Sequence, residues 1–393
     1  MVKQGIIKPV TKPTPVVNPM VIVRKNGKIR LCLDPSELNR IIKRRHYPLT
    51  SLEDIATRIG HSNYFSLLDA KKGFWQIKVT ERSSQYLTMN TPWGRYSFLR
   101  LPFGLASAPE IFQQVINKVL ENIKGVECSM DDILLHAESI EKLQSITSKV
   151  INRLQEYGIK LNKDKCQYNK QEIKFLGHLL TPDGIKIDPE KIEAIKKIKT
   201  PTKVKELQRL LGMVNYLAKF IPNHALLTEP LRRLLVKGIA WEWSEEQEIA
   251  FQKIKEALMN APKLAYYDVN KEVTLSVDSS QYAVGAVLLQ EGRPIAYATK
   301  SLTPVQQTYP QIEKEAFAIK FGCYKFHQYI YGKKLTIETD HKPIESIAKK
   351  NIAKAPPRLQ RLLFDISQYE AKIMYRKGID LPLADLLLHN MRP

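Results

Sequence analysis

Two aspartates stand side by side at Asp131 and Asp132, with apolar residues close on both sides. This pattern predicts a carboxylate pair at the turn of a β-hairpin. A third aspartate, Asp69, ends another apolar run over residues 64–69. Carboxylates at two strand ends can hold two divalent metal ions at one point. The sequence therefore predicts an acidic metal site of the kind that phosphoryl-transfer chemistry requires.

The charge of the chain limits its partners. Its 393 residues include 61 Lys and Arg against 40 Asp and Glu, which gives a formal net charge of +21. Such an excess favours a polyanion such as nucleic acid. An acidic membrane surface would attract the same charge, but we predict no amphipathic basic helix that would make that contact specific.

Cysteine usage and hydropathy indicate the compartment. The four cysteines are far apart and form no CxxC pair, so we expect reduced core thiols rather than a disulfide framework or a zinc site. No apolar run reaches transmembrane length, and the N-terminus is basic and proline-rich, unlike a secretory signal. We expect an intracellular protein that has no membrane contact; a cytoplasmic particle and the nucleus stay open as locations.

The length of the chain indicates two or three domains. Residues 1–20 contain four prolines, which predicts an extended or polyproline-like lead-in rather than a packed element. A β-hairpin is predicted over residues 20–33, with its turn at Asn26-Gly27. Ser51 and Asp54 have the spacing of a capping box and predict the start of a helix.

Apolar residues at helical spacing predict further helices near residues 108–122, 143–157 and 207–218. Proline and glycine at 182–184 predict another hairpin. From Glu272 onward apolar residues alternate along a strand that leads into Asp278. We therefore expect a new α/β unit to begin near residue 270.

Several blocks follow one another in a fixed order: Leu33-Asp34-Pro35, Leu38-Asn39, Tyr64-Phe65-Ser66-Leu67-Leu68-Asp69, Gly73-Phe74-Trp75-Gln76-Ile77, Leu101-Pro102-Phe103-Gly104-Leu105-Ala106-Ser107-Ala108-Pro109, Met130-Asp131-Asp132 and Phe175-Leu176-Gly177-His178. In this order they resemble the reverse transcriptases of gypsy-type LTR retrotransposons. The segment Leu211–Asn223 is similar to the family's connection, and residues 272–390 are similar to its RNase H domain. The resemblance covers almost the whole chain.

The resemblance implies an α+β right-hand polymerase with fingers, palm and thumb, followed by a connection and an α/β RNase H-like domain. Fingers and palm would occupy residues 1–190, thumb and connection 191–270, and the RNase H-like domain 271–393. The implied activities are RNA-directed DNA synthesis and hydrolysis of RNA in RNA/DNA hybrids. The implied partners are an RNA template, a DNA primer, an RNA/DNA hybrid and dNTPs, and the sequence does not indicate an oligomeric state.

The resemblance also implies roles for polymerase residues. Asp69 and Asp131 would hold two Mg²⁺ ions, with Mn²⁺ as a substitute, and Asp132 would support them. Because like charges repel, this cluster is expected to ionise poorly until metal binds. Phe74 would lie under the incoming sugar and select deoxynucleotides, although a plain core position is the alternative. Phe103, within the block 101–104, would line the nucleotide pocket.

Basic residues would contact the nucleotide and the primer. Lys25 and Arg30 on the predicted hairpin match family residues that grip the triphosphate, and arginine suits this role because it binds phosphate bidentately. Arg24 and Lys28 stay open as alternatives to Lys25. Lys165 falls where the family places a lysine that protonates pyrophosphate. The block 175–178 would be a hairpin that grips the primer, with a surface position an equal alternative for its histidine.

In the RNase H-like domain the resemblance assigns two further Mg²⁺ ions to four acids, Asp278, Glu315, Asp340 and Asp385. Glu313 shares the helix with Glu315, but the position just before the apolar run favours Glu315. The segment after Asp385 departs from the family pattern, which puts RNase H activity in more doubt than polymerase activity.

Another departure is Ser129, because the family usually places an aromatic residue there. The first alternative to an active enzyme is a decayed remnant that binds nucleic acid without turnover. A cellular DNA-dependent polymerase fits poorly, because an RNase H domain would have no purpose in it.

Overall fold

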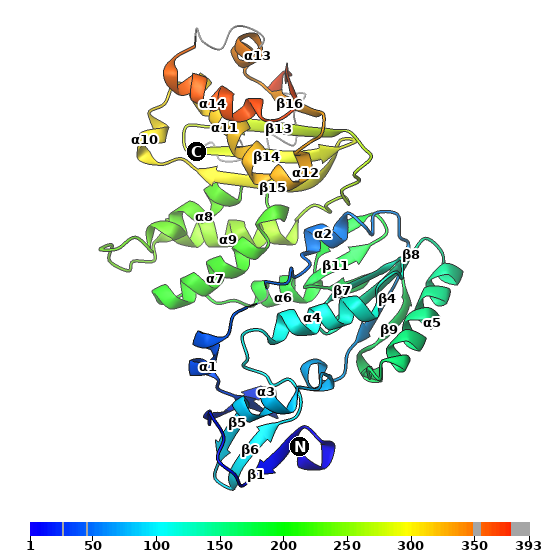
Figure 1. The fold of residues 1–393 in the computed structure, drawn as a ribbon. Helices are drawn as coiled ribbons and strands as arrows, with labels where there is room; N and C mark the ends of the chain where they lie inside the picture. The colour runs from blue at the N-terminus through cyan, green and yellow to red at the C-terminus, as the bar shows by residue number, and fades with distance from the viewer. Residues whose placement is uncertain (26, 45, 349–354, 379–393) are drawn as a thin grey trace. The chain divides into compact units, whose positions relative to one another are not determined.

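The computed structural model describes residues 1–25, 27–44, 46–348 and 355–378. The chain divides into two compact units, Met1–Leu176 and Gly177–Pro393 (Figure 1). The predicted division at residues 190 and 270 stays a prediction. Over the described ranges, no helix combines the length and the apolar character needed to cross a bilayer.

The first unit begins with strands and short helices and then forms a sheet with two longer helices. Its elements are η1 Val2–Gln4, β1 Ile7–Val10, β2 Met20–Lys25, β3 Lys28–Leu33, α1 Ser36–Ile41, α2 Leu52–Ala56, β4 Tyr64–Asp69, η2 Gly73–Gln76, α3 Glu81–Tyr86, β5 Thr88–Thr91, β6 Gly94–Phe98, α4 Ala108–Val119, β7 Val126–Ser129, β8 Asp132–Ala137, α5 Ile140–Glu156, η3 Lys163–Lys165, β9 Gln167–Lys170 and β10 Ile173–Phe175.

The four-stranded sheet of this unit has the strand order β7-β8-β4-β9. Helices α4 and α5 pack on the face that carries Leu68 and Ile133, and they contribute Phe112 and Val150 to the same buried cluster. Helix α5 forms because its apolar residues recur along one stripe, and because the Ser139 side chain accepts a hydrogen bond from a backbone N–H of the first turn.

The N-terminal segment corrects one expectation and confirms another. Residues 7–10 form β1 and pair with β6, and Ile6 and Ile7 are buried in the same cluster as Phe98. The prediction of an unpacked lead-in over residues 1–20 is therefore wrong at its start. The predicted hairpin over 20–33 is confirmed as β2 and β3, which pair from Met20↔Leu33 to Lys25↔Lys28.

The second unit begins with a hairpin and four helices and ends in a larger sheet. Its elements are β11 His178–Thr181, β12 Gly184–Ile187, α6 Pro189–Lys196, α7 Val204–Tyr216, η4 Ala218–Phe220, α8 His224–Arg233, α9 Glu245–Met259, β13 Val273–Ser279, β14 Ala283–Gln290, β15 Arg293–Ser301, α10 Pro304–Gln307, α11 Gln311–Lys325, α12 His327–Ile330, β16 Leu335–Thr339, α13 Lys342–Ala348, α14 Pro357–Ser367 and β17 Ala371–Tyr375.

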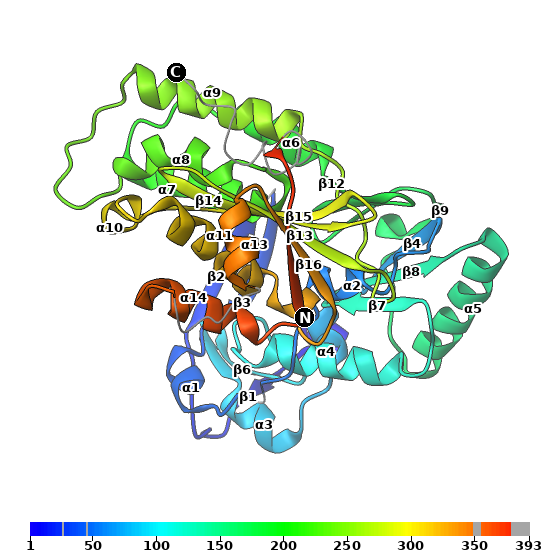
Figure 2. The same ribbon diagram turned by 90° about the horizontal axis from the view of Figure 1, so that it is seen from above.

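The sheet of the second unit has the order β15-β14-β13-β16-β17. Its first three strands pair antiparallel, and β13, β16 and β17 pair parallel. Helix α11 crosses β13 and β14 (Figure 2), and Ile319 packs with Leu275, Val277 and Ile337 in one buried cluster. This mixed sheet, covered by α11, places the ends of β13 and β16 side by side.

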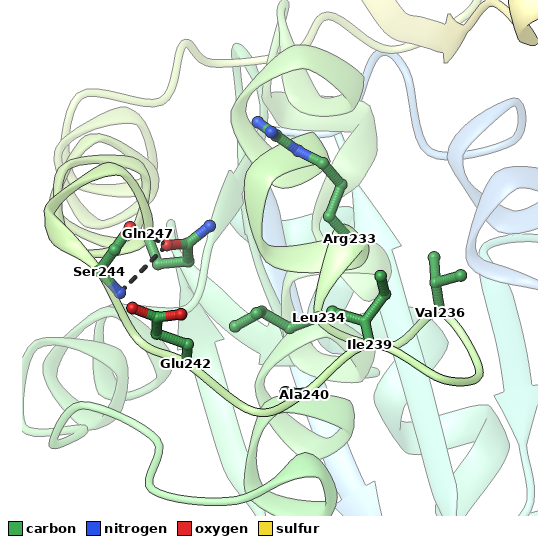
Figure 3. Close-up of a pocket in the computed structure, with 8 residues that line it drawn as sticks. All are labelled: Arg233, Leu234, Val236, Ile239, Ala240, Glu242, Ser244 and Gln247. Carbon is green, nitrogen blue, oxygen red and sulfur yellow. Dashed lines mark hydrogen bonds between the residues drawn. The ribbon is translucent and has the colours of Figure 1, made fainter.

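Helices α8 and α9 pack together and precede the sheet in the chain. Helix α9 starts with a capping box, in which Ser244 N donates to Gln247 Oε1 at 3.2 Å (Figure 3). A hollow of about 420 Å³ lies beside this start and is lined by Leu234, Val236 and Ile239.

Candidate active sites

The paired aspartates lie where the sequence predicts them, at a hairpin turn. Strands β7 and β8 pair with Ser129 opposite Asp132, so Met130 and Asp131 form a two-residue turn. Strand β4 pairs with β8 so that Asp69 lies opposite Asp132. The backbone N–H of Ala70 donates to Asp131 O at 2.8 Å. Residues that are distant in sequence are thereby brought to one edge of the four-stranded sheet.

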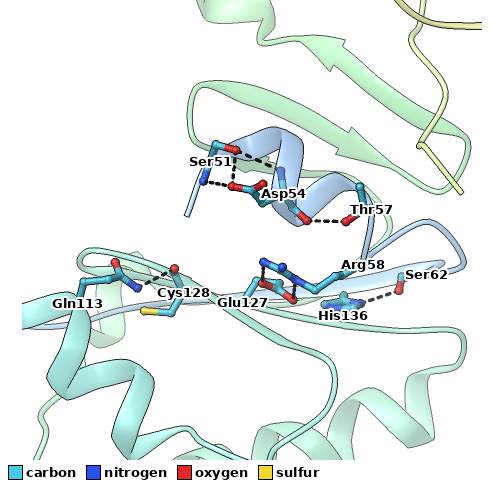
Figure 4. A network of polar contacts seen from close by, with 9 residues as sticks. All are labelled: Ser51, Asp54, Thr57, Arg58, Ser62, Gln113, Glu127, Cys128 and His136. Carbon is cyan, nitrogen blue, oxygen red and sulfur yellow. Dashed lines mark hydrogen bonds and ion pairs between the residues drawn. The ribbon is translucent and has the colours of Figure 1, made fainter. Parts of the chain in front are cut away.

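The turn is held in place by Gln113, a buried residue of α4 that the sequence analysis missed. Gln113 Oε1 accepts from Met130 N at 2.8 Å. Gln113 Nε2 donates to Cys128 O at 3.0 Å, as Figure 4 shows. Met130 has φ of 54°, a left-handed conformation that costs a residue other than glycine about 1–3 kcal/mol. The Gln113 contacts therefore stabilise a strained turn at the acidic site.

An ion pair to β7 is the second contact that stabilises the hairpin strands. The Arg58 guanidinium contacts Glu127 through Nε at 2.6 Å and Nη2 at 2.7 Å (Figure 4). The neighbouring β8 residue His136 contacts Ser62 Oγ through Nδ1 at 2.8 Å. Burial lowers the pKa of His136 to about 4, with a further contribution from the charge of Arg58.

The carboxylate of Asp131 lies against Gly73, the first residue of η2. A Cβ atom added at Gly73 would lie 1.9 Å from Asp131 Oδ1. That approach is far closer than van der Waals contact, so any side chain at position 73 would force the Asp131 carboxylate to move. Within the block 73–77, Phe74 is therefore not the one residue with a predicted role, because Gly73 leaves room for the carboxylate of Asp131, a candidate metal ligand.

The electrostatics of the hairpin depend on Lys165. Its Nζ contacts Asp69 Oδ2 at 2.8 Å, and this hydrogen bond raises the pKa of Lys165. Burial raises the pKa of Asp132, and the charge of Asp69 raises it further, whereas Lys165 acts in the opposite direction. An ammonium ion therefore compensates part of the negative charge at this site.

Aromatic residues lie beside the hairpin. The Phe74 ring in η2 lies 5.1 Å from the Phe103 ring and 5.7 Å from the Phe112 ring, measured between centroids. Phe74 and Phe103 are both half-buried. In the β2–β3 register, Arg30 pairs with Val23, and Lys25 pairs with Lys28.

Three predicted acids of the second unit come together. Asp278 lies on β13, Glu315 on α11, and Asp340 directly after β16, and one carboxylate oxygen of each lies within 4.8 Å of the others. The parallel pairing of β13 and β16 brings the two aspartates to one sheet edge. Among the residues that the structure describes, this is the one group of three such side chains that converges so closely.

Glu315 is the most buried of the three acids, with 1% of its surface exposed. Burial raises its pKa to about 7, and the charges of Asp278 and Asp340 contribute to the rise. Two hydrogen bonds act against it: Ser279 Oγ donates to Glu315 Oε1 at 2.7 Å, and Gln311 Nε2 donates to the same oxygen at 3.1 Å. Burial and like charge thus make it unfavourable for all three carboxylates to be ionised, and a bound divalent cation would reduce that repulsion.

The remaining predicted residues have different outcomes. Glu313 stands outside the trio and pairs with Arg358 Nη1 at 2.8 Å. Asp385 lies outside the described residues, so its role stays a prediction. His178 is 3% exposed, and its ring lies 5.6 Å from Phe220 and 5.3 Å from Tyr216. The surface position considered for His178 is therefore wrong, because an aromatic cluster buries the ring.

Two sequence families match the chain. The family described as "Reverse transcriptase (RNA-dependent DNA polymerase)" matches residues 18–180, which include the hairpin. The family described as "RNase H-like domain found in reverse transcriptase" matches residues 243–337, which include two acids of the trio.

Similar curated proteins are polyproteins of transposons. The Pol polyprotein from transposon 297 of Drosophila melanogaster is 35% identical over 394 residues, which cover 98% of this chain and 37% of that protein. The Tf2-3 polyprotein of Schizosaccharomyces pombe is 31% identical and is matched over 98% of this chain and 30% of its own length. The chain thus spans about a third of the length of these relatives.

Solved structures support the fold. A foamy viral protease-reverse transcriptase in complex with double-stranded DNA has a TM-score of 0.88 at 24% identity, and the match covers 96% of this chain and 68% of that one. The same viral protein in complex with an RNA/DNA hybrid has a TM-score of 0.83 at 24% identity, with 100% and 54% covered. The fold is thus a right-hand polymerase with an RNase H-like domain. The chain therefore contains a reverse transcriptase domain followed by an RNase H-like domain of the kind found in reverse transcriptases, and its relatives are Pol polyproteins of gypsy-type LTR retrotransposons.

Proposed function

We propose that this chain is an RNA-directed DNA polymerase that also hydrolyses RNA in RNA/DNA hybrids. The observation that carries the proposal is the hairpin, which brings Asp131 and Asp132 beside Asp69 in a unit of reverse transcriptase sequence. The second acidic cluster, at Asp278, Glu315 and Asp340, supports the second activity. Acids are intact in both centres, which argues against a decayed remnant.

At the polymerase centre, Asp69 and Asp131 would hold two Mg²⁺ ions, or Mn²⁺ in their place. Bound ions would lower the pKa of the primer 3′-hydroxyl and neutralise the triphosphate. Asp132 would support the site from the opposite strand position. Lys165, whose Nζ lies 2.8 Å from Asp69 Oδ2, is proposed to donate a proton to the leaving pyrophosphate.

At the RNase H centre, Asp278, Glu315 and Asp340 would hold a second pair of Mg²⁺ ions. Asp385 is proposed to complete this set. Glu315 would bind as a carboxylate and release its proton when metal binds, because burial and like charges raise its pKa to about 7 in the metal-free protein. Bound metal would activate the water that attacks the RNA phosphate.

The proposed partners are an RNA template, a DNA primer, dNTPs and an RNA/DNA hybrid, inside the cell. A net charge of +21 supports polyanionic partners. The similar viral enzyme has been solved in complex with double-stranded DNA and with an RNA/DNA hybrid. Lys25 and Arg30 are proposed to contact the triphosphate from the β2–β3 hairpin.

Primer extension tests the polymerase proposal directly. The purified chain should extend a DNA primer on an RNA template with dNTPs and Mg²⁺, and chelation of the metal should stop the reaction. Asp131→Asn should abolish extension, because a neutral amide holds a divalent ion more weakly than a carboxylate. Template binding without any extension by the parent chain would contradict the proposal.

Nucleotide selection tests the role of Phe74. Phe74→Val should admit ribonucleotides at least about tenfold more readily than the parent, because the smaller side chain removes the clash with the 2′-hydroxyl. The matched control is Phe364→Val, at a residue that is 75% exposed on α14. If Phe74→Val excludes ribonucleotides as strongly as the parent, Phe74 serves only the packing of the aromatic cluster.

A further inference from the structure

A basic groove of about 650 Å³ runs beside α5 in the first unit. We name it the α5 groove and define it by Lys124, Lys142, Lys149, Asn152, Arg153 and Glu156. None of these residues belongs to the acidic hairpin or to the nucleotide contacts proposed above. The groove is therefore a candidate for a separate binding surface.

The topology places the α5 groove away from the hairpin. Strand β8 starts at Asp132 beside the turn, and α5 begins only after β8 has ended at Ala137. Six strand residues span roughly 20 Å. Lys124 precedes β7 and so lies at the same far end of the sheet, and Arg153 Nη1 donates there to Val119 O, the last residue of α4, at 3.2 Å.

The charges in the groove are only partly compensated. Lys142 Nζ lies 3.6 Å from a Glu138 oxygen, and Arg153 Nε lies 3.7 Å from a Glu156 oxygen. Both pairs are exposed or half-exposed, so they bind weakly and are open to exchange. Lys124 and Lys149 are exposed and have no carboxylate partner among the described residues. Four cations thus face a single lining carboxylate.

The spacing of the cations fits an extended ligand. Lys142, Lys149 and Arg153 recur at intervals of seven and four residues on one face of α5. These intervals correspond to rises of roughly 10 Å and 6 Å along the helix. The cations therefore form a line rather than a point, as a chain of phosphates requires.

The remaining lining residues favour nucleic acid over a protein partner. Only two of the ten lining side chains are apolar, and none is aromatic. Protein interfaces depend on buried aromatic or aliphatic anchors, which this groove lacks. Neutral donors such as the Asn152 amide suit contacts to phosphate and sugar.

We propose that the α5 groove binds the phosphate backbone of a single-stranded nucleic acid segment outside the polymerase centre. Proteins bind single strands through a positively charged groove that tracks the backbone together with aromatic side chains that stack on the bases, and the α5 groove supplies the first of these two features. Because the lining contains no aromatic side chain for base stacking, binding should be insensitive to sequence. The proposal goes beyond polymerase and RNase H activity and requires neither.

The test measures binding of a second ligand to the full chain. The polymerase cleft is first saturated with an unlabelled blunt DNA hairpin, and fluorescent dT₁₂ is then titrated in at several KCl concentrations. The parent should bind dT₁₂ under these conditions, and dA₁₂ about equally. Lys124→Ala/Lys149→Ala should weaken binding roughly fivefold or more, and its plot of log affinity against log salt should be less steep by about 1.4.

Two matched variants control for charge and for position. Lys124→Arg/Lys149→Arg keeps both charges and should keep the parent's salt slope. Lys237→Ala/Lys325→Ala removes two exposed lysines from the second unit and should also leave the slope unchanged. Thermal unfolding of each variant checks that the fold is intact.

Three results would overturn the proposal. One is a parent chain that binds no dT₁₂ once the duplex is saturating. Another is a Lys124→Ala/Lys149→Ala variant with the parent's affinity and salt slope. The third is displacement of dT₁₂ by poly-L-glutamate as effectively as by unlabelled oligonucleotide at equal charge, which would indicate an acidic protein segment as the occupant.

Discussion

The two acidic centres of this chain handle the repulsion between carboxylates differently. In the second unit, Asp278, Glu315 and Asp340 bring their oxygens within 4.8 Å of one another, and burial raises the pKa of Glu315 to about 7. At the hairpin of the first unit, Asp69, Asp131 and Asp132 do not all come within that distance of one another. There, Lys165 contacts Asp69 at 2.8 Å.

The difference shows two ways to keep carboxylates close in a folded chain. The RNase H trio is held by neutral hydrogen-bond donors such as Ser279 and Gln311, and it keeps part of its charge suppressed by protonation until metal arrives. The polymerase hairpin stays more open and uses an ammonium group as a counter-ion. We infer that the carboxylates of the RNase H centre are already close together before metal binds. The polymerase centre, in contrast, is completed by metal, primer and nucleotide.

Among residues that support the acids without binding metal themselves, Gly73 is expected to have the largest effect on the rate of primer extension. Gly73→Ala places a Cβ where Asp131 Oδ1 lies 1.9 Å away, so the carboxylate must move. A displacement of about 1 Å costs on the order of 100-fold in rate, so primer extension should fall by about that factor while RNA cleavage stays at the parent level.

Gly212→Ala in α7 is the matched control for Gly73→Ala. A Cβ there meets nothing within 4 Å, so the variant should be as stable as the parent or more stable by about 0.5–1 kcal/mol. Parent-like extension by Gly73→Ala would show that the site does not depend on the position of Asp131.

The next largest effect on primer extension is expected at Gln113, which supports the hairpin by hydrogen bonds to its backbone. Gln113→Ala leaves the Met130 N–H without its acceptor beside a left-handed backbone. Loss of this contact should cost about 1–3 kcal/mol of unfolding free energy and slow extension about tenfold. Gln144→Ala, at an exposed position of α5, is the control and should extend primers like the parent. An unchanged extension rate in Gln113→Ala would show that the hydrogen bonds of Gln113 do not support the active hairpin.

A pH titration of metal binding separates the two centres. Because the pKa of Glu315 is raised to about 7, protons compete with metal below that pH and not above it. In the Asp131→Asn background, calorimetry should show Mn²⁺ affinity at the RNase H centre falling up to about tenfold per pH unit below pH 7. Ser279→Ala removes a hydrogen bond that lowers this pKa, so the decline should start at higher pH. A flat affinity between pH 8 and pH 6 would argue against a proton on Glu315.

The smallest effect concerns stability in acid. Burial lowers the pKa of His136 in the first unit and of His224 in the second to about 4. The unfolded chain binds protons below about pH 6.5, so stability should be complete above that pH and decline as the pH falls toward 4. The slope should be at most about 1.4 kcal/mol per pH unit for each histidine.

Urea unfolding at pH 7 and pH 5 measures this slope. His136→Gln should lose part of the pH dependence, because the glutamine cannot titrate. His61→Gln, at an exposed position, should keep the parent's dependence. An equal pH dependence in both variants would show that His136 is not the group responsible.

Local patterns in the sequence were sufficient for the elements that carry the acids. The hairpin follows from apolar runs on both sides of Asp131 and Asp132, and the helix of Glu315 follows from the apolar residues after it. These signals lie within a few residues of the site, which is the range over which periodicity is informative. The trio itself needed the family's order of blocks, because no local pattern places Asp340 beside Asp278.

What the sequence analysis missed depends on contacts between distant residues. The pairing of β1 with β6 joins residues about ninety positions apart, and four prolines concealed it. Gln113 and the Met130 turn are close in space but belong to different elements, so spacing gave no signal. The aromatic cluster that buries His178 likewise forms only when α7 and η4 fold against β11.

One reaction tests most directly whether two separate metal-dependent centres exist in this chain. A labelled RNA template annealed to a differently labelled DNA primer is incubated with dNTPs and Mg²⁺, and extension and RNA cleavage are measured together. Asp131→Asn should lose extension and keep cleavage, and Asp278→Asn should do the reverse. Loss of both activities in either variant, or continued extension in Asp131→Asn, would contradict the account.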